Sequence, residues 1–148
     1  MAIDVAVPLD RAFSVFTEQF DRIKPRHHNL LAVDIAETVL EAEPGGRVYD
    51  RGVDGSICVF ARVKVVEPPH RLVLAWLISP RWQIEDREDR VSEVEVRFSA
   101  IDDDHTHVEL RHSGLARHGA GWESAASALS GEEGWPLYLH RFGQLGGT

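Results

Sequence analysis

The stretch SICVFARVKVVEPPHRLVLAWLI, residues 56–78, holds two apolar segments on either side of a Pro-Pro pair. The first segment, residues 56–66, alternates along its length and therefore predicts a strand. This alternation places Ile57, Val59, Ala61, Val63 and Val65 on one face and Cys58, Phe60, Arg62 and Lys64 on the other. The second segment, residues 71–78, is almost wholly apolar and predicts a strand covered on both faces. Because the Pro-Pro pair predicts a turn, the two segments should form an antiparallel hairpin.

The same kind of pattern continues on both sides of this hairpin. Further alternating segments lie at residues 2–7, 31–42, 47–51, 91–100 and 106–113. The turn signals between them include Pro44-Gly45-Gly46 and Asp102–Asp104. Residues 79–90 combine Ser79-Pro80 with a run of mixed charges and predict a solvated loop.

Two stretches have helical rather than strand-like spacing. A short amphipathic helix is predicted from Leu9, after Pro8, and Pro25 should stop any continuation. A longer helix-like stretch opens at Gly121-Trp122-Glu123, and the glycines at 131 and 134 interrupt it.

The order of these elements is strand, helix, a run of hairpin strands and a terminal helix. It predicts an α+β domain in which a curved antiparallel sheet wraps around the C-terminal helix and encloses a central cavity. The length of 148 residues predicts one domain over residues 1–148. An enclosed cavity makes binding of a small molecule the leading functional hypothesis.

Composition excludes several classes of partner. Lys and Arg number 16 and Asp and Glu 24, so the formal net charge is −8. Such an acidic chain lacks the basic footprint of a nucleic-acid-binding protein and would be repelled by anionic lipids. We therefore expect no nucleic-acid partner and no membrane association, and the N-terminal residues do not resemble a signal peptide. The single cysteine, Cys58, cannot form an intrachain disulfide, which predicts a cytoplasmic protein with Cys58 as a small buried hydrophobe.

The eight histidines raise the question of a metal site. His105 and His107 share a strand face but lie beside an exposed turn, and His27 and His28 lie in a polar loop where adjacent side chains should diverge. We therefore predict no metal site. No nucleophile elbow, phosphate-binding glycine loop or other cofactor motif occurs, so no cofactor and no catalytic residue are assigned.

His112 is the histidine with the best claim to a function. It shares a strand face with Val108 and Leu110, the face expected to point toward the helix and the cavity. Two interpretations stay open, a satisfied core histidine and a polar contact or general base for a bound ligand.

The aromatic residues leave a similar choice between core packing and cavity wall. Trp76 ends the most apolar strand, and Trp122 opens the C-terminal helix. Aromatic rings line most apolar small-molecule pockets, so both are candidate wall residues. The predicted ligand-binding set is Trp76, Phe98, Val108, Leu110, His112 and Trp122.

Several motifs taken together resemble a known family. They are EPGGR at 43–47, VEPPHRLVLAW at 66–76, SEVEVRF at 92–98, HSG at 112–114 and GWE at 121–123. Over nearly the whole chain they are similar to homologues of the activator of the heat-shock-protein-90 ATPase. That family belongs to the START-like, polyketide-cyclase-like (SRPBCC) superfamily. The resemblance implies the helix-grip fold and a deep cavity between the sheet and the C-terminal helix, but it carries no universal catalytic set.

Three functions follow from the residues and the resemblance. The first is binding of a small hydrophobic or amphipathic ligand in the cavity. The second is a protein-interaction module, either a chaperone-cofactor-like domain or a homodimer. The third is an enzyme of the cyclase or dehydratase type that uses His112, which would require an acid or hydroxyl beside this side chain.

Overall fold

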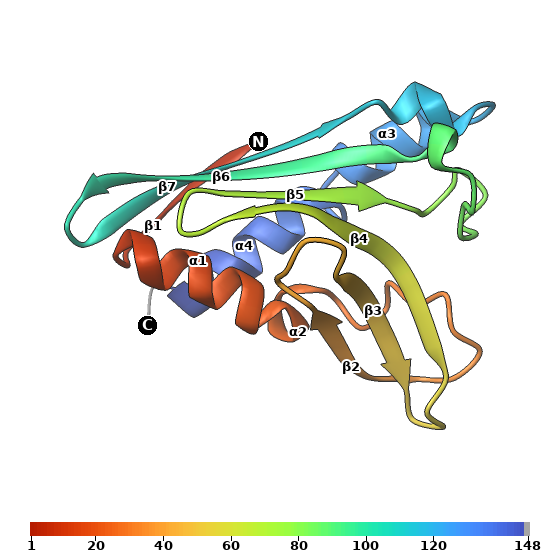
Figure 1. Cartoon of the computed structure of the whole chain (residues 1–148), viewed down its shortest axis with the longest axis horizontal. Helices are drawn as coiled ribbons and strands as arrows, with labels where there is room; N and C mark the ends of the chain where they lie inside the picture. The colour runs from red at the N-terminus through yellow and green to blue at the C-terminus, as the bar shows by residue number, and fades with distance from the viewer. Residues whose placement is uncertain (147–148) are drawn as a thin grey trace.

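Figure 1 shows the computed structural model of the protein, which describes residues 1–146. Within these residues, seven antiparallel strands form one sheet in the order β1-β7-β6-β5-β4-β3-β2. The strands are β1 (Ala2–Val5), β2 (Ile35–Leu40), β3 (Arg47–Gly52), β4 (Ile57–Glu67), β5 (Arg71–Trp76), β6 (Ser92–Asp102) and β7 (His105–Ser113). From β2 to β7 each strand pairs with the next one along the chain, whereas β1 pairs with the distant β7. The long strand β4 is bent, so that β3 and β2 turn toward the helices.

Helices lie against the concave face of this sheet. The α-helices are α1 (Leu9–Glu18), α2 (Phe20–Ile23), α3 (Trp122–Ser130) and α4 (Trp135–Gly146), and two 3₁₀ helices are η1 (Glu88–Arg90) and η2 (Leu115–His118). The sequence prediction of a short helix after Pro8 that ends before Pro25 is confirmed. Helix α4 contacts α1, α2 and β1 and so closes the curved sheet. None of the helices in the described residues is long and apolar enough to cross a membrane.

The C-terminal helical stretch is bent, as its interrupted sequence predicts. Helix α3 ends at Ser130 and α4 begins at Trp135, and residues 131–134 form the turn between them. A Cβ atom on Gly134 would lie 2.1 Å from the backbone oxygen of Leu129, so this close approach requires a glycine. The bend turns α3 away from the axis of α4 and leaves space beneath the turn.

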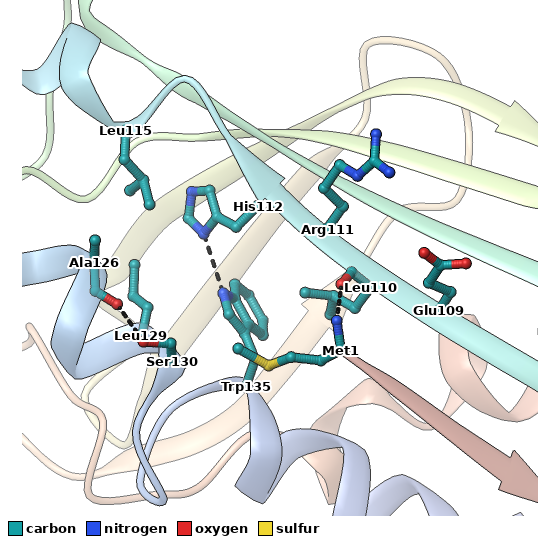
Figure 2. Close-up of a pocket in the computed structure, with 10 residues that line it drawn as sticks. All are labelled: Met1, Glu109, Leu110, Arg111, His112, Leu115, Ala126, Leu129, Ser130 and Trp135. Atoms are coloured by element: carbon teal, nitrogen blue, oxygen red, sulfur yellow. Dashed lines mark hydrogen bonds between the residues drawn. The ribbon is translucent and has the colours of Figure 1, made fainter.

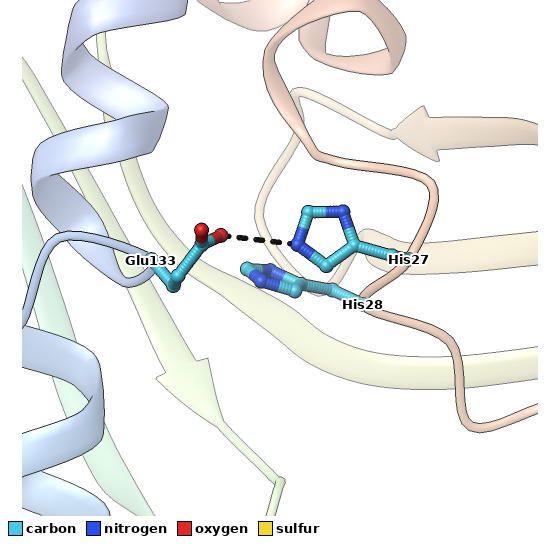
Figure 3. A group of neighbouring side chains, drawn as sticks. All are labelled: His27, His28 and Glu133. Atoms are coloured by element: carbon cyan, nitrogen blue, oxygen red, sulfur yellow. Dashed lines mark hydrogen bonds and ion pairs between the residues drawn. The ribbon is translucent and has the colours of Figure 1, made fainter.

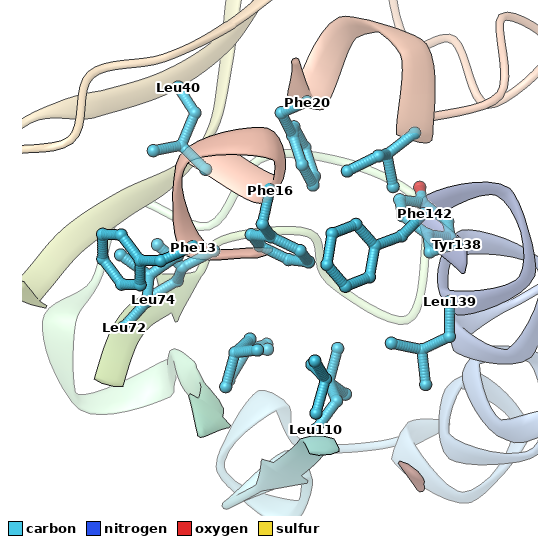
Figure 4. Packing of buried hydrophobic residues seen from close by; sticks show 14 of the residues in the cluster. Phe13, Phe16, Phe20, Leu40, Leu72, Leu74, Leu110, Tyr138, Leu139 and Phe142 are labelled. Carbon is cyan, nitrogen blue, oxygen red and sulfur yellow. The ribbon is translucent and has the colours of Figure 1, made fainter. Parts of the chain in front are cut away.

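Aromatic side chains fill one end of the concave face (Figure 4). Phe16 of α1 meets Phe142 of α4 edge-to-face, with ring centroids 5.4 Å apart. Phe98 of β6 packs against Phe13 at 5.2 Å and against Phe16 at 5.8 Å. Such pairs stabilise by about 0.5–1.5 kcal/mol beyond the burial of their area. These rings fill the space between α1 and the sheet. The cavity described below therefore lies at the other end of the concave face.

The prediction of strict alternation along residues 56–66 is wrong. In the pairing with β3, Val48 lies opposite Ala61 and Tyr49 opposite Val59, so Phe60 is an extra residue of β4. In the pairing with β5, the register shifts again between Val63 and Val65. Each β-bulge inserts an extra residue and reverses the faces of the residues that follow. Consecutive residues Phe60 and Ala61 are therefore both buried, and Phe60 lies in the same core cluster as Ala61 and Val63.

The other predicted strands are present with shifted bounds: β1, β2 and β5 are shorter than predicted, whereas β3, β6 and β7 extend one or two residues further at one end. The strand expected over residues 31–42 is β2, which covers only Ile35–Leu40 and has a register shift near its start. Three consecutive residues of β5, Leu72 to Leu74, are buried, which confirms a strand covered on both faces. Residues 79–90 form an exposed loop as predicted, apart from η1 and a bridge between Ile78 and Ile84.

Candidate functional site

The main cavity lies between the concave face of the sheet and the turn that joins α3 to α4. Its volume is about 390 Å³. The lining residues are Lys24, His27, His28, Asn29, Leu30, Asp50, Phe60, Trp76, Ile78, Trp82, Ala128, Leu129, Glu133, Gly134, Trp135 and Tyr138. A concave, mostly apolar space with a few converging polar groups is typical of a small-molecule site.

A chain of aromatic rings forms one wall of the main cavity. Trp76 lies 5.8 Å from Phe60 and 5.1 Å from Trp135, measured between ring centroids, and Trp135 lies 4.9 Å from Tyr138. Trp82 is 52% exposed at the edge of the cavity and has a φ of 58°, a backbone conformation that bulky residues rarely adopt. These flat surfaces suit a planar, apolar ligand.

A buried ion pair lies beside this wall, with Lys24 Nζ 5.2 Å from the centroid of the Phe60 ring. Lys24 Nζ is 3.0 Å from Asp50 Oδ2, and each side chain is only 3% exposed. Thr38 Oγ1 donates a hydrogen bond of 2.7 Å to Asp50 Oδ1, and Lys24 also donates to the backbone oxygen of His28. Burial lowers the pKa of Lys24 despite the attraction of Asp50. Both charges are satisfied inside the protein, so the pair orders the loop that carries His28.

His28 and Tyr138 form the polar contact that faces the interior of the cavity. His28 Nδ1 and Tyr138 Oη are 3.1 Å apart, and the two rings stack with centroids 5.6 Å apart. Burial, together with the positive charges of His27 and Lys24, lowers the pKa of His28, while burial raises the pKa of Tyr138. At neutral pH the pair is therefore a neutral imidazole and a protonated phenol. Such a pair can donate a hydrogen bond to a ligand oxygen or move a proton to or from it.

His112 lies behind Trp135 and outside the main cavity. It lines a second pocket of about 370 Å³ between β7 and α3, together with Leu110, Leu115 and Leu129 (Figure 2). Trp135 Nε1 donates a hydrogen bond of 3.0 Å to His112 Nδ1. An indole nitrogen can only donate, so the proton of neutral His112 is on Nε2.

The tautomer of His112 fixes the direction of a longer hydrogen-bond chain. His112 Nε2 lies 2.7 Å from Ser92 Oγ and donates to it, and Ser92 Oγ lies 2.7 Å from His118 Nε2. The pKa of His112 is lowered to about 4, mainly by burial and to a smaller extent by the neighbouring His118. Within the described residues His118 Nδ1 is buried and has no hydrogen-bond partner. This series of hydrogen bonds fixes the position of the Trp135 indole, which is part of the aromatic wall.

The structure separates the six residues predicted from the sequence. Trp76 lines the main cavity, whereas Leu110 and His112 line the second pocket. Phe98 packs on the helix α1 aromatics, and Val108 is fully buried in the same core cluster. Trp122 is partly buried at the start of α3 and belongs to neither lining set.

Sequence reasoning missed most of the polar residues of the main cavity. Lys24, Asp50 and Tyr138 were not assigned to a site, and His28 was considered only as a metal ligand. A signal for Asp50 existed, since it shares a face of its strand with the apolar Val48. An acidic residue on a core-facing position needs a buried partner.

Comparison with known proteins agrees with this architecture. The family model described as activator of Hsp90 ATPase homolog 1-like protein matches residues 6–147. Among curated proteins none matches the chain. Among solved structures, the anthrahydroquino-γ-pyrone synthase Txn09, complexed with a ligand, is 36% identical, with a TM-score of 0.68, over 98% of this chain and 94% of that one.

Two more distant structures share the fold. The self-sacrificing resistance protein CalC from Micromonospora echinospora is 23% identical, with a TM-score of 0.67, over 98% of this chain and 90% of that one. An HSP90 activator from Plasmodium falciparum is 19% identical, with a TM-score of 0.58, over 98% of this chain and 92% of that one. The helix-grip fold is thus the predicted one, and the chain belongs to the family of activator of Hsp90 ATPase homolog 1-like proteins.

Proposed function

We propose that the protein binds a small, planar, amphipathic aromatic molecule in the main cavity. The observation that carries this proposal is that Phe60, Trp76 and Trp135 line the same cavity as the hydrogen-bonded His28 and Tyr138. The wall offers stacking surfaces for an apolar ring system, and the polar pair offers a hydrogen bond to an oxygen on its edge. The 36% identity to a synthase named for an anthrahydroquinone supports the same class of ligand.

Of the residues predicted from the sequence, Trp76 contacts the ligand directly in this proposal. His112 acts indirectly, because it fixes the indole of Trp135 from the second pocket. Leu110 lines that same pocket, and Phe98 and Val108 support the sheet beneath α1. Trp122 has no contact with the main cavity that would give it a role in binding.

A hydroxylated anthraquinone, 1,8-dihydroxyanthraquinone, is a suitable probe for this proposal. We expect it to quench tryptophan fluorescence, because Trp76, Trp82 and Trp135 all line the cavity. Tyr138→Phe removes one hydrogen-bonding hydroxyl and should weaken binding about 5- to 10-fold, corresponding to about 1–1.5 kcal/mol. Fluorescence titration measures the quenching and the affinity, and isothermal titration calorimetry measures the affinity independently.

Tyr49→Phe is the matched control, since Tyr49 is the other tyrosine and its ring packs against Arg47 away from the cavity. Its affinity for the probe should equal that of the unmodified protein. An absence of binding across a panel of aromatic and lipid-like molecules, and an empty protein in native mass spectrometry, would contradict the proposal. That outcome would favour the protein-interaction module or homodimer.

A second candidate function is ring closure on the bound molecule. Two observations favour it: the similarity to a pyrone synthase, and a neutral imidazole next to a protonated phenol inside the cavity. The acid–base pair of this candidate is His28 and Tyr138, rather than His112, because the latter lies behind Trp135. General acid–base catalysis of this kind contributes roughly 10²–10⁴-fold to a rate.

His28→Gln tests this second function, because glutamine keeps a polar side chain but cannot shuttle a proton. An anthrahydroquinone with an unclosed side chain serves as substrate, and mass spectrometry with chromatography follows the cyclised product. We expect the turnover rate to fall by about 100-fold or more, a larger loss than the loss of probe affinity. Unchanged turnover in His28→Gln would remove the pair from the mechanism.

We also propose a cytoplasmic location. It rests on cysteine use: Cys58 is the sole cysteine of the sequence, and it is partly buried, with a pKa raised by burial. Proteins of oxidising compartments commonly carry paired cysteines, which this sequence lacks.

A further inference from the structure

Three potential metal ligands come together at the mouth of the main cavity. His27 and His28 lie in the loop after α2, and Glu133 lies in the turn between α3 and α4 (Figure 3). Their ligand atoms all lie within 4.8 Å of one another, and this is the one such group found in residues 1–146. The polar loop predicts that the two histidine side chains diverge, but their rings meet edge-to-face with centroids 4.5 Å apart. That expectation is therefore wrong.

We propose that His27, His28 and Glu133 bind a divalent transition-metal ion, with Zn²⁺ as the best fit. Two imidazoles and one carboxylate are a donor set that zinc and its neighbours in the first transition row accept readily. Oxygen-preferring ions such as Mg²⁺ and Ca²⁺ would not select a site in which two of three donors are nitrogen.

The distances require only small movements of exposed side chains. Zinc–nitrogen and zinc–oxygen bonds of about 2.0–2.2 Å in a tetrahedral site place the donor atoms about 3.3 Å apart. His27 Nε2 and Glu133 Oε2 are already 3.1 Å apart. Both side chains are largely exposed, at 64% and 76%, so they can rotate to close the remaining gaps.

His28 is held more firmly than the other two ligands. Tyr138 Oη contacts its Nδ1, the buried Lys24 donates a hydrogen bond to its backbone oxygen, and its backbone nitrogen donates to Pro25 at 3.2 Å. Ring orientation by an outer partner is a general feature of metal-binding histidines. The positive charge of Lys24 is offset by Asp50 at 3.0 Å, so it opposes an incoming cation only weakly.

An ordinary surface ion pair is the competing explanation for the contact between His27 and Glu133. Such a pair would need no third residue, yet the ring of His28 lies against His27 and lines the same cavity. Three protein donors also leave at least one coordination position open. If the main cavity binds an oxygen-bearing ligand, which is the proposed function, this open position can receive its oxygen.

The test uses tag-free protein that has been treated with a chelator and then titrated with Co²⁺ alone, followed by Zn²⁺. We expect binding of one Co²⁺ per chain, with visible absorption bands that Zn²⁺ abolishes by competition. His27→Ala and Glu133→Gln should each weaken binding by about 100-fold, since even the loss of an outer partner commonly costs 10–100-fold. Both positions are exposed, and circular dichroism will verify the fold.

His70→Ala is the matched control, because His70 is an exposed histidine in the turn between β4 and β5, outside this cluster. It should bind Co²⁺ as the unmodified protein does. An absence of binding, or binding that survives both His27→Ala and Glu133→Gln, would overturn the proposal and leave an ordinary ion pair. No aromatic ligand is present in this titration. Repeating the probe titration of the unmodified protein with a chelator present lets the two proposals fail separately.

Discussion

Asp50→Ala is expected to lower the free energy of unfolding by about 3–5 kcal/mol, because it leaves the buried Lys24 without its partner. The Lys24 ammonium lies 3.0 Å from the Asp50 carboxylate and is only 3% exposed. Little water can therefore solvate the ammonium once the carboxylate is removed. Thr38 would lose its hydrogen-bond acceptor at the same time. Urea unfolding followed by circular dichroism measures the change, with the slope of the transition used to verify that the folded state is unaltered.

Two further variants test whether the loss of stability comes from the unpaired buried charge. Glu37→Ala breaks an exposed ion pair with Arg51 on the neighbouring strands, where both side chains are about half exposed, and it should cost about 1 kcal/mol or less. The double variant Lys24→Met with Asp50→Leu removes both buried charges and should recover most of the loss. A cost for Asp50→Ala no greater than that of Glu37→Ala would show that Lys24 finds water or another partner.

Acid is expected to destabilise the protein through His112 well above the pH at which most carboxylates titrate. The pKa of this side chain is about 4 in the folded protein, against about 6.5 in an unfolded chain. Between these two values the unfolded state binds more protons than the folded state, so stability falls as the pH falls. The contribution is fully present above about pH 6.5, and about 3 kcal/mol of it is lost by about pH 4.

The comparison with His112→Gln isolates this contribution. Glutamine can still accept from Trp135 and donate to Ser92, but it does not titrate. Urea unfolding midpoints at pH 7.5 and at pH 4.5 should therefore differ less in the variant than in the unmodified protein. The effects of His28, His118 and the carboxylates cancel in this comparison, because both proteins share them. Parallel pH profiles would show that His112 titrates normally in the folded state.

Local patterns in the sequence were sufficient to predict most of the fold. The alternating segments and their Pro and Gly turns identify a meander of strands, because each strand from β2 to β7 pairs with its neighbour in sequence. The interruption at residues 131–134 is visible from its glycines. The bulges of β4 are not visible in this way, since an inserted residue leaves an apolar run such as Val59 to Ala61 looking continuous.

The candidate site was harder to predict because its contacts join residues far apart in the sequence. Lys24 meets Asp50 across 26 positions, and His28 meets Tyr138 across 110. Periodicity shows which side of an element faces inward but not which partner it meets there. His112 illustrates the limit: its face was predicted correctly, but the bend before α4 places Trp135 between this histidine and the main cavity.

The pairing of β1 with β7 has a consequence during synthesis on the ribosome. Ala2 lies opposite Glu109, so β1 is synthesised more than 100 residues before its partner strand. At about 5–20 residues per second, β1 must wait roughly 5–20 s for β7 to be made. In that interval β2 to β6 can already form hairpins, while β1 still lacks its partner strand. Among the strands of the sheet, β1 is therefore the one that waits longest for its partner during synthesis.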